Sequence, residues 1–194
     1  DRARQTSFLV PGLTIRVTDT RGEEPRTEEF RHDGGVVDFA DFLAPDPPVT
    51  DTWHLTGVGT FAETVQHLDA KGHLRPREVE RECHVDIAVR WGTGYDTAVR
   101  TFVNIIATPK GGSHLAGFEQ ALLKTVRTAV EGNARRLKVT ARDGRIEKDD
   151  VMAGLTALVT VRFPEPQFEG QTKEVLGTAP VRGVVARVVE RELE

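Results

Sequence analysis

Near its C-terminal end the chain reads LTALVTVRFPEPQFEGQTK, from Leu155 to Lys173. The apolar run Leu155–Phe163 predicts a buried strand. Pro164 and Pro166 end that strand, because proline cannot donate a hydrogen bond to a sheet ladder. Gly170 then frees the backbone just before the last three residues. We therefore expect a loop that leaves the sheet and carries three polar side chains at its tip, those of Gln171, Thr172 and Lys173.

The tip of this loop combines one amide, one hydroxyl and one ammonium group. Such groups suit an anion such as a phosphate, and a lysine supplies a compact point charge. The alternative interpretation is a solvated lysine at the start of a helix. The tripeptide alone leaves both interpretations open.

The bulk composition is that of a globular chain with a real core. It has 194 residues, 38% of them hydrophobic and 29% charged, and these values fit one domain or one domain with an appendage. The formal net charge of −4 argues against a general nucleic-acid binder, although a local basic face stays possible. The single cysteine, Cys83, excludes an internal disulfide framework and fits a reducing cytoplasm. No apolar run reaches the roughly 18 residues of a membrane span, and no signal peptide opens the chain.

Both ends of the chain have helical patterns. Asp1–Leu9 indicates a helix that is already under way, and the last stretch, Val181–Glu194, is amphipathic without a glycine stop signal. Its apolar positions are Val181, Val184, Val185, Val188 and Leu193. We expect this chain to be a piece of a longer protein.

The N-terminal third predicts a hairpin followed by a short helix. Strict alternation over 13–19 indicates a half-buried strand, and 27–31 returns as its partner. A helix is predicted over 36–43, with Asp33 as its cap.

The middle of the chain predicts three strands. Residues 49–68 are strand-like, but Gly57 and Gly59 suggest a bulge or bend, and a polar loop follows over 69–76. The strand over 79–91 turns Cys83, Val85, Ile87, Val89 and Trp91 to one face and Glu82, His84, Asp86 and Arg90 to the other. Residues 98–106 are more continuously apolar, so this strand is expected at the centre of the sheet.

A long helix is predicted over about 115–136, with Ser113 as a candidate cap. Its apolar face repeats at helical spacing through Leu115, Phe118, Leu122, Val126 and Val130. A short helix over 147–154 leads into the strand at Leu155. Together these elements predict an α/β (α+β) fold, a two-layer sandwich in which a mixed β-sheet carries helices on one face.

The sequence excludes several familiar active sites. It has no GxSxG, no Walker loop and no GxGxxG. Cys83 lies within a strand pattern and is expected in the core, and the histidines at 32, 54, 67, 73, 84 and 114 show no metal-ligand spacing. The pair Gly111-Gly112 precedes a helix N-terminus and could hold an anion, which is a weak signal on its own. From the residues alone, no complete active site is predicted in this chain, and Lys173 is expected to contribute its charge to a site formed mostly by other residues.

Two stretches resemble the B subunits of bacterial type IIA DNA topoisomerases. The first, Lys110-Gly111-Gly112-Ser113-His114-Leu115-Ala116-Gly117-Phe118, is similar to the signature GGTHxxGF, with Ser113 in place of the usual threonine. The second, from Val151 to Lys173, is similar to REGLxAxxSVKxPxPxFEGQTK. The resemblance covers essentially the whole chain, with a poor match over 49–82. It identifies the chain as a member of the gyrase or topoisomerase IV B-subunit family.

Within that family the match is to the transducer domain. The resemblance implies a ribosomal-protein-like sheet backed by helices, with a left-handed βαβ crossover. It also implies three segments: 1–10 as the end of a linker helix from an ATPase domain, 11–178 as the transducer, and 179–194 as a helix leading towards the cleavage core.

The same resemblance gives the site and its partners. Lys173 is expected to act as the catalytic lysine at the γ-phosphate of ATP, with Gln171 beside it. ATP and Mg²⁺ belong to the full-length protein, whose ATPase domain holds the nucleotide, and we expect none bound to this chain, which should be monomeric and inactive alone. The full-length subunit is expected to be cytoplasmic, to dimerise, to act with an A subunit on DNA and to make no membrane contact.

Alternatives remain for the function and for one surface. A free-standing α/β module that binds a phosphorylated ligand or RNA is the second hypothesis, and a plain interaction domain is the third. A basic cluster of Arg135, Arg136, Lys138, Arg142 and Arg145 follows the long helix. The residues Arg135, Arg136 and Lys138 are predicted to face captured DNA, and the competing interpretation is a solvated helix end.

Overall fold

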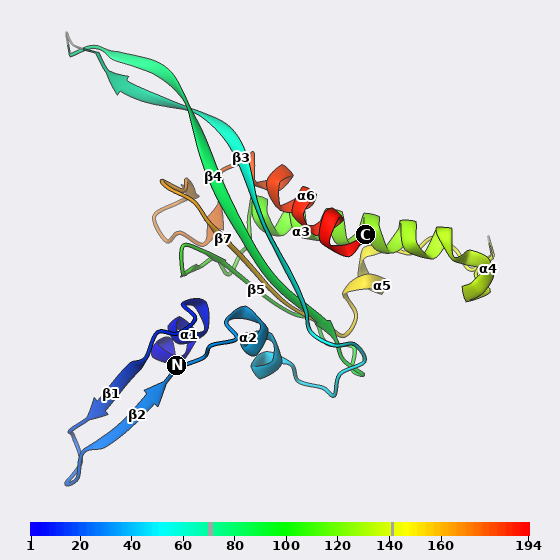
Figure 1. Cartoon of the computed structure of the whole chain (residues 1–194), viewed down its shortest axis with the longest axis horizontal. Helices are drawn as coiled ribbons and strands as arrows, with labels where there is room; N and C mark the ends of the chain where they lie inside the picture. The colour runs from blue at the N-terminus through cyan, green and yellow to red at the C-terminus, as the bar shows by residue number, and fades with distance from the viewer. Residues whose placement is uncertain (70–71, 141) are drawn as a thin grey trace. The chain divides into compact units, whose positions relative to one another are not determined.

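The computed structural model describes residues 1–69, 72–140 and 142–194, and these form two compact units. The first unit comprises Asp1–His54, Ile87–Val99 and Ala153–Leu158, and the second comprises Leu55–Asp86, Arg100–Met152 and Val159–Glu194. Figure 1 labels the elements. Their bounds are α1 Arg2–Leu9, β1 Ile15–Asp19, β2 Arg26–Phe30, α2 Val36–Leu43, β3 Trp53–Leu68, β4 Leu74–Trp91, β5 Ala98–Val103, β6 Ile106–Ala107, α3 Ser113–Gly132, α4 Ala134–Leu137, α5 Lys148–Met152, β7 Leu155–Arg162, β8 Phe168–Glu169, β9 Val175–Leu176 and α6 Val181–Leu193.

The main sheet has five strands in the order β3-β4-β7-β5-β6, so the predicted mixed α/β sandwich is confirmed. The strand from Leu155 to Arg162 lies at its centre and is buried along almost its whole length. The predicted central place of the strand beginning at Ala98 is wrong, because that strand turns at Asn104 and Ile105 into the short edge strand β6. The left-handed crossover stays a prediction.

In the first unit, an aromatic cluster joins α1 to α2. Phe8 is 2% exposed, and its ring stacks on His32 and on Phe39 at centroid distances of 3.6 and 4.7 Å. The Ser7 hydroxyl is 2.8 Å from Nδ1 of His32. The helix α2 has the predicted bounds, but the predicted cap is wrong. Asp33 pairs with Arg31, and the backbone N–H of Gly34 donates to the carboxylate of Asp38 instead.

The hairpin β1–β2 forms as predicted but is not half-buried. Val17, the central apolar residue of β1, is 46% exposed. Cross-strand pairs hold the two strands together, with Arg16 bound to Glu29 at 2.9 Å and the Thr18 and Thr27 hydroxyls 3.0 Å apart. In this hairpin the alternation of apolar and polar residues over 13–19 therefore accompanies strand pairing without burial of one face.

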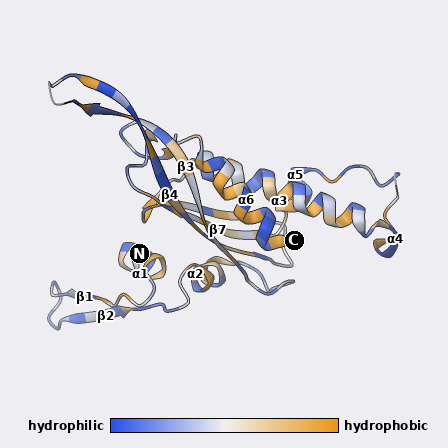
Figure 2. Cartoon of the chain, turned by 45° about the horizontal axis from the view of Figure 1, so that its top comes forward, coloured by the Kyte–Doolittle hydropathy of each residue, from blue (hydrophilic) through white to orange (hydrophobic). Residues whose placement is uncertain are grey.

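In the second unit, α3 and α6 lie side by side, and α6 packs on β3 (Figure 1). Hydrophobic residues recur along both helices in Figure 2. A Cβ at Gly117 of α3 would stand 2.4 Å from the carbonyl oxygen of Arg182, so only glycine allows the two helices to approach this closely. The face of α6 buries Val181, Val184, Val185 and Val188 as predicted, together with Val189.

Gly57 and Gly59 do not interrupt the strand that contains them, which runs without a break from Trp53 to Leu68. A Cβ at Gly57 would meet Val188 at 2.9 Å, and one at Gly59 would meet Val184 at 2.7 Å. These glycines make room for α6, and the predicted bulge or bend stays a prediction. The next strand begins at Leu74, earlier than the predicted Val79, and part of the predicted polar loop, residues 70 and 71, lies outside the described residues.

The face of β4 that was predicted to be polar is not exposed to solvent along its whole length. Arg90, predicted on the polar face, is 8% exposed and bonds to the Asp41 carboxylate at 2.8 Å, within the first unit.

The predicted long helix ends at Gly132, and Asn133 separates it from the short helix α4. Ser113 is the first residue of α3 rather than its cap. None of the helices among the described residues is long and apolar enough to cross a membrane.

Candidate functional site

The segment after β7 folds back as a short hairpin. Its strands β8 and β9 pair antiparallel, with Phe168 opposite Leu176 and Glu169 opposite Val175. We call residues 167–177 the QTK hairpin. The predicted loop after Pro166 thus contains a short ladder of two residue pairs. The pairing turns the tip into a defined turn on a strand ladder.

The tip of the QTK hairpin is exposed. Gln171, Thr172 and Lys173 are all accessible to solvent, and Gly170 and Lys173 have positive φ values of 77° and 57°. The backbone N–H of Lys173 donates to the carbonyl of Gly170 at 3.4 Å, a long bond. The Lys173 ammonium lies 5.8 Å from the centroid of the Phe168 ring. The nearest following helix begins at Val181, so the interpretation as a lysine at a helix start is wrong.

The second strand of the QTK hairpin docks on the loop that precedes α3. The Leu176 N–H donates to the Gly111 carbonyl at 3.0 Å, and the Lys110 N–H donates to the Glu174 carbonyl at 3.1 Å. Leu176 is 1% exposed, and burial of such a side chain stabilises the dock by about 2 kcal/mol. The glycine loop of the first resembling stretch thus contacts the residues that directly follow Lys173, the end of the second stretch.

A charge cluster lies beside the tip. The Lys110 ammonium is 2.7 Å from a carboxylate oxygen of Glu174, and the Thr172 hydroxyl donates to the same oxygen at 3.1 Å. The bond from Lys110, followed by the one from Thr172, holds the pKa of Glu174 below its usual value. Sequence analysis missed this pair because 64 residues separate its members. The cluster binds Lys110 to Glu174, the residue that follows Lys173 in the chain.

A buried polar network holds the loop that precedes α3, on which the QTK hairpin docks. His114 is fully buried, and its Nε2 lies 3.1 Å from the Thr108 hydroxyl. The Thr101 hydroxyl donates to the Thr108 carbonyl at 2.6 Å, which ties the loop to β5. Burial lowers the pKa of His114 to about 4, so the imidazole is neutral at pH 7. Sequence analysis missed this role, although His114 lies one turn before Phe118 on the apolar face of the helix.

Acid should therefore destabilise the chain through His114. Its pKa is lower in the folded state than in the unfolded state, about 4 against 6.5, so the unfolded chain binds more protons between these values. The stability that comes from keeping this imidazole neutral is present above pH 6.5 and is lost as the pH falls towards 4, by about 3 kcal/mol in all. Urea unfolding at pH 7 and pH 4.5 measures the loss.

The matched variants for this prediction are His114→Gln and His67→Gln. His114→Gln should be less stable at pH 7 but should lose less on acidification. His67→Gln, which changes an exposed histidine, should follow the parent chain at both pH values. An equal acid loss in the parent chain and in His114→Gln would contradict the assignment.

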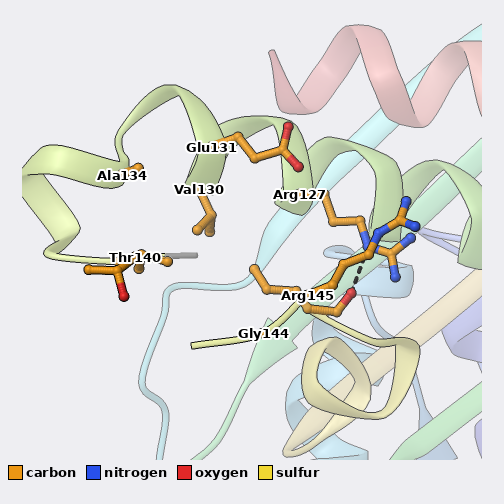
Figure 3. A pocket seen from close by; sticks show the side chains of 9 residues that line it. Arg127, Val130, Glu131, Ala134, Thr140, Gly144 and Arg145 are labelled. Atoms are coloured by element: carbon orange, nitrogen blue, oxygen red, sulfur yellow. Dashed lines mark hydrogen bonds between the residues drawn. The ribbon is translucent and has the colours of Figure 1, made fainter. Parts of the chain in front are cut away.

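The basic cluster follows α3 in the chain, next to a separate pocket at the end of that helix. Arg135, Arg136 and Lys138 are exposed on and just after α4, and Lys138 has a left-handed backbone conformation. Beside them a cavity of about 280 Å³ is lined by residues that include Val130, Thr140 and Arg145 (Figure 3). Arg127 donates from Nε to the Ile146 carbonyl at 2.6 Å and closes its inner end. Arg142 and Arg145 are exposed as well, and of the cluster only Arg145 is among the residues that line the pocket.

Cys83 belongs to the core rather than to either surface. Cys83 is buried, as predicted, and burial raises the pKa of its thiol to about 12. Within residues 1–69, 72–140 and 142–194, no group of three or more metal-ligating side chains is found.

Comparison with known proteins gives the family. The family model for DNA gyrase B matches residues 35–194. The DNA gyrase B protein of Mycoplasma genitalium is 34% identical over 194 residues, which cover 100% of this chain and 28% of the relative, and that of Treponema denticola is 31% identical over 99% of this chain and 27% of the relative. The 43K ATPase domain of Thermus thermophilus gyrase B superposes with a TM-score of 0.70 at 27% identity, over 99% of this chain and 45% of that one.

These matches span the chain, including both stretches of the site described above. The chain covers only about a quarter of the length of these curated relatives, 27% and 28%. The family model nevertheless matches most of the chain, and the chain therefore belongs to the DNA gyrase B family.

Proposed function

We propose that this chain is the transducer domain of a gyrase or topoisomerase IV B subunit and that the tip of the QTK hairpin senses the γ-phosphate of ATP. In this proposal 1–10 is the end of a linker helix, 11–178 is the transducer, and 179–194 leads towards the cleavage core. The observation that carries the proposal is the dock itself. Leu176 and Gly111 fix the hairpin to the loop that precedes α3, and the tip stays exposed and cationic.

The side chains at the tip fit a terminal phosphate. Lys173 offers a point charge, Thr172 a hydroxyl and Gln171 an amide, and all three are exposed on one turn. Lys173 is the proposed catalytic group, and Gln171 is its proposed neighbour at the phosphate. The nucleoside and Mg²⁺ would be held by an ATPase domain of the same subunit, so the chain alone is expected to be inactive.

The mechanism depends on differential affinity. ATP carries the phosphate that the tip can reach and ADP does not, so ATP favours the docked arrangement of the two domains. Reversing a 1:99 preference needs about 5.5 kcal/mol. A desolvated lysine–phosphate contact supplies a few kcal/mol of this free energy. Association of the two subunits of the dimer around the captured DNA would supply the rest. The A subunit, DNA and a cytoplasmic location complete the proposed setting.

Hydrogen exchange of the full-length subunit tests the sensor directly. With a non-hydrolysable ATP analogue, the backbone amides of 170–173 should exchange at least about tenfold more slowly than with ADP, because only the analogue has the group that the tip binds. The amides of β7 serve as an internal control and should not respond. Equal exchange with both nucleotides would rule out the sensor. A free-standing phosphate-binding module would instead show the protection in the 194-residue chain itself.

We also propose that Arg135, Arg136 and Lys138 face captured DNA. All three are exposed and lie within four consecutive residues on and just after α4, which favours this role. Changing all three to glutamate should weaken DNA-stimulated ATP turnover of the full-length subunit with its A subunit, most strongly at low salt, because phosphate contacts release counterions. ATP binding should not change. A triple change at Arg16, Arg21 and Arg26, exposed on the β1–β2 hairpin, is the control. If both triple variants behave alike, the cluster is only a solvated helix end.

A further inference from the structure

One arginine connects the β3–β4 ladder to the base of the QTK hairpin. Arg81 of β4 has a side chain only 14% exposed. Its Nε lies 3.1 Å from a carboxylate oxygen of Glu63 on β3, which is 18% exposed, and its terminal nitrogen donates to the carboxylate of Glu165. These carboxylates, that of Glu63 foremost, raise the pKa of Arg81, so the guanidinium is charged at every working pH.

Glu165 stands at an unusual point of the backbone. It lies between Pro164 and Pro166, and its φ is 53°, a left-handed value that glutamate seldom adopts. Proline fixes φ on both sides, so the conformation of Glu165 sets the direction in which the chain leaves β7. A conformation of this kind persists only where the surroundings hold it, and the Arg81 guanidinium binds the side chain at this residue.

Other bonds hold the residues around Glu165. The Asn104 side chain donates to the Phe163 carbonyl at 2.8 Å and accepts from the Phe163 N–H at 3.0 Å. On the other side, the Gln167 N–H donates to the Thr178 hydroxyl at 3.0 Å. The base of the hairpin is therefore held before and after Glu165. The part of the chain that the structure describes records two bonds at the tip, the 3.4 Å backbone bond of Lys173 and the bond from the exposed Thr172 hydroxyl to Glu174 at 3.1 Å. Contacts that hold the residues around Glu165 therefore also determine the position of the tip residues 171–173.

We propose that Arg81 is a positioning residue. By bridging Glu63 and Glu165 it fixes the base of the QTK hairpin to the β3–β4 ladder and so sets where Lys173 stands. The proposal rests on the phosphate-sensing role of that hairpin. Arginine is suited to the task because its planar fork binds two carboxylates at once, which the single ammonium of a lysine holds poorly.

The cleanest test changes Glu165 rather than Arg81. Removing Arg81 would leave the partly buried Glu63 without its partner and would weaken the fold as a whole. Glu165→Gln breaks only the link to the hairpin and keeps the Arg81–Glu63 pair. Glu169→Gln is the matched control, since it removes the same charge from an exposed residue of the same hairpin for which the described part of the chain records no ion pair.

Hydrogen exchange of the 194-residue chain gives the first readout. In Glu165→Gln the amides of Gln167 and Gly177 should exchange about three- to tenfold faster, a modest effect because one partner of the bridge is exposed. The amide of Phe163, held by Asn104, should not respond. If Glu165→Gln and Glu169→Gln exchange alike, Arg81 does not hold the hairpin and the proposal fails.

Turnover of the full-length subunit gives the second readout. Glu165→Gln and Arg81→Lys should each lower kcat by about fivefold while the KM for ATP stays within about twofold, because the lost group acts through Lys173 and not on the nucleotide. If exchange rises but kcat does not fall while Lys173→Ala is impaired, the bridge is structural only and the proposal is overturned. If Lys173→Ala is itself unimpaired, the sensing function fails, and the exchange result still decides whether Arg81 holds the hairpin.

Discussion

Replacing Lys173 with alanine is expected to lower ATP turnover by the full-length subunit about 100- to 1,000-fold, roughly 3–4 kcal/mol in the barrier. The ammonium is the one group of the tip that carries charge, and the fold holds it on an exposed turn. In the proposed mechanism it faces the terminal phosphate, where charge redistributes during cleavage. The affinity for ADP should change little, since the rest of the nucleotide is held elsewhere. Steady-state turnover and ADP binding measure the two effects.

Two further variants separate charge from geometry at the same tip. Lys173→Arg should rescue poorly, because a planar fork does not replace a point charge at a fixed distance. Gln171→Ala should lose less activity than Lys173→Ala, because a neutral hydrogen bond is worth about half of a charge-assisted one. Near-normal turnover of Lys173→Ala, or an equal loss of ADP and ATP binding, would show that this hairpin is not the γ-phosphate sensor.

The sequence predicted the elements whose pattern is local. The helix over 36–43, the buried strand from Leu155 and the amphipathic helix from Val181 all form where apolar periodicity placed them. The exposed Gln171-Thr172-Lys173 tip was also predicted, because prolines and a glycine mark the exit from β7. These features depend on neighbours within a few residues along the chain, and composition and spacing report such neighbours directly.

The sequence did not predict the features that depend on distant partners. Gly57 and Gly59 indicated a bulge or bend, but their contacts with Val188 and Val184 of α6, more than a hundred residues later, were not predicted. Glu174 meets Lys110 and Glu165 meets Arg81 only because the fold brings together segments that lie far apart in the sequence. The central strand was misplaced for the same reason, since apolar content alone does not give strand order. Pairing across the chain is set by tertiary packing, which one-dimensional patterns do not record.

The glycine loop gives the largest expected effect on stability. Gly112 has φ 131° and ψ −158°, a region open essentially to glycine alone. A Cβ there would lie 2.4 Å from the backbone nitrogen and oxygen of Leu176, and no rotamer change can move backbone atoms away. Gly112→Ala should therefore force the QTK hairpin off its dock and lower the free energy of unfolding by about 3–4 kcal/mol.

Gly132→Ala is the opposite control, because it adds the same methyl group to the last residue of α3, where no atom lies within 4 Å. Alanine favours a helix over glycine, so this variant should be neutral or about 0.5–1 kcal/mol more stable. Urea unfolding of both variants measures the contrast. In the full-length subunit, Gly112→Ala should also lose ATP turnover with Lys173 still present, since an undocked hairpin no longer holds its lysine at the phosphate. Normal stability of Gly112→Ala would mean that the contact between this loop and Leu176 does not hold the hairpin.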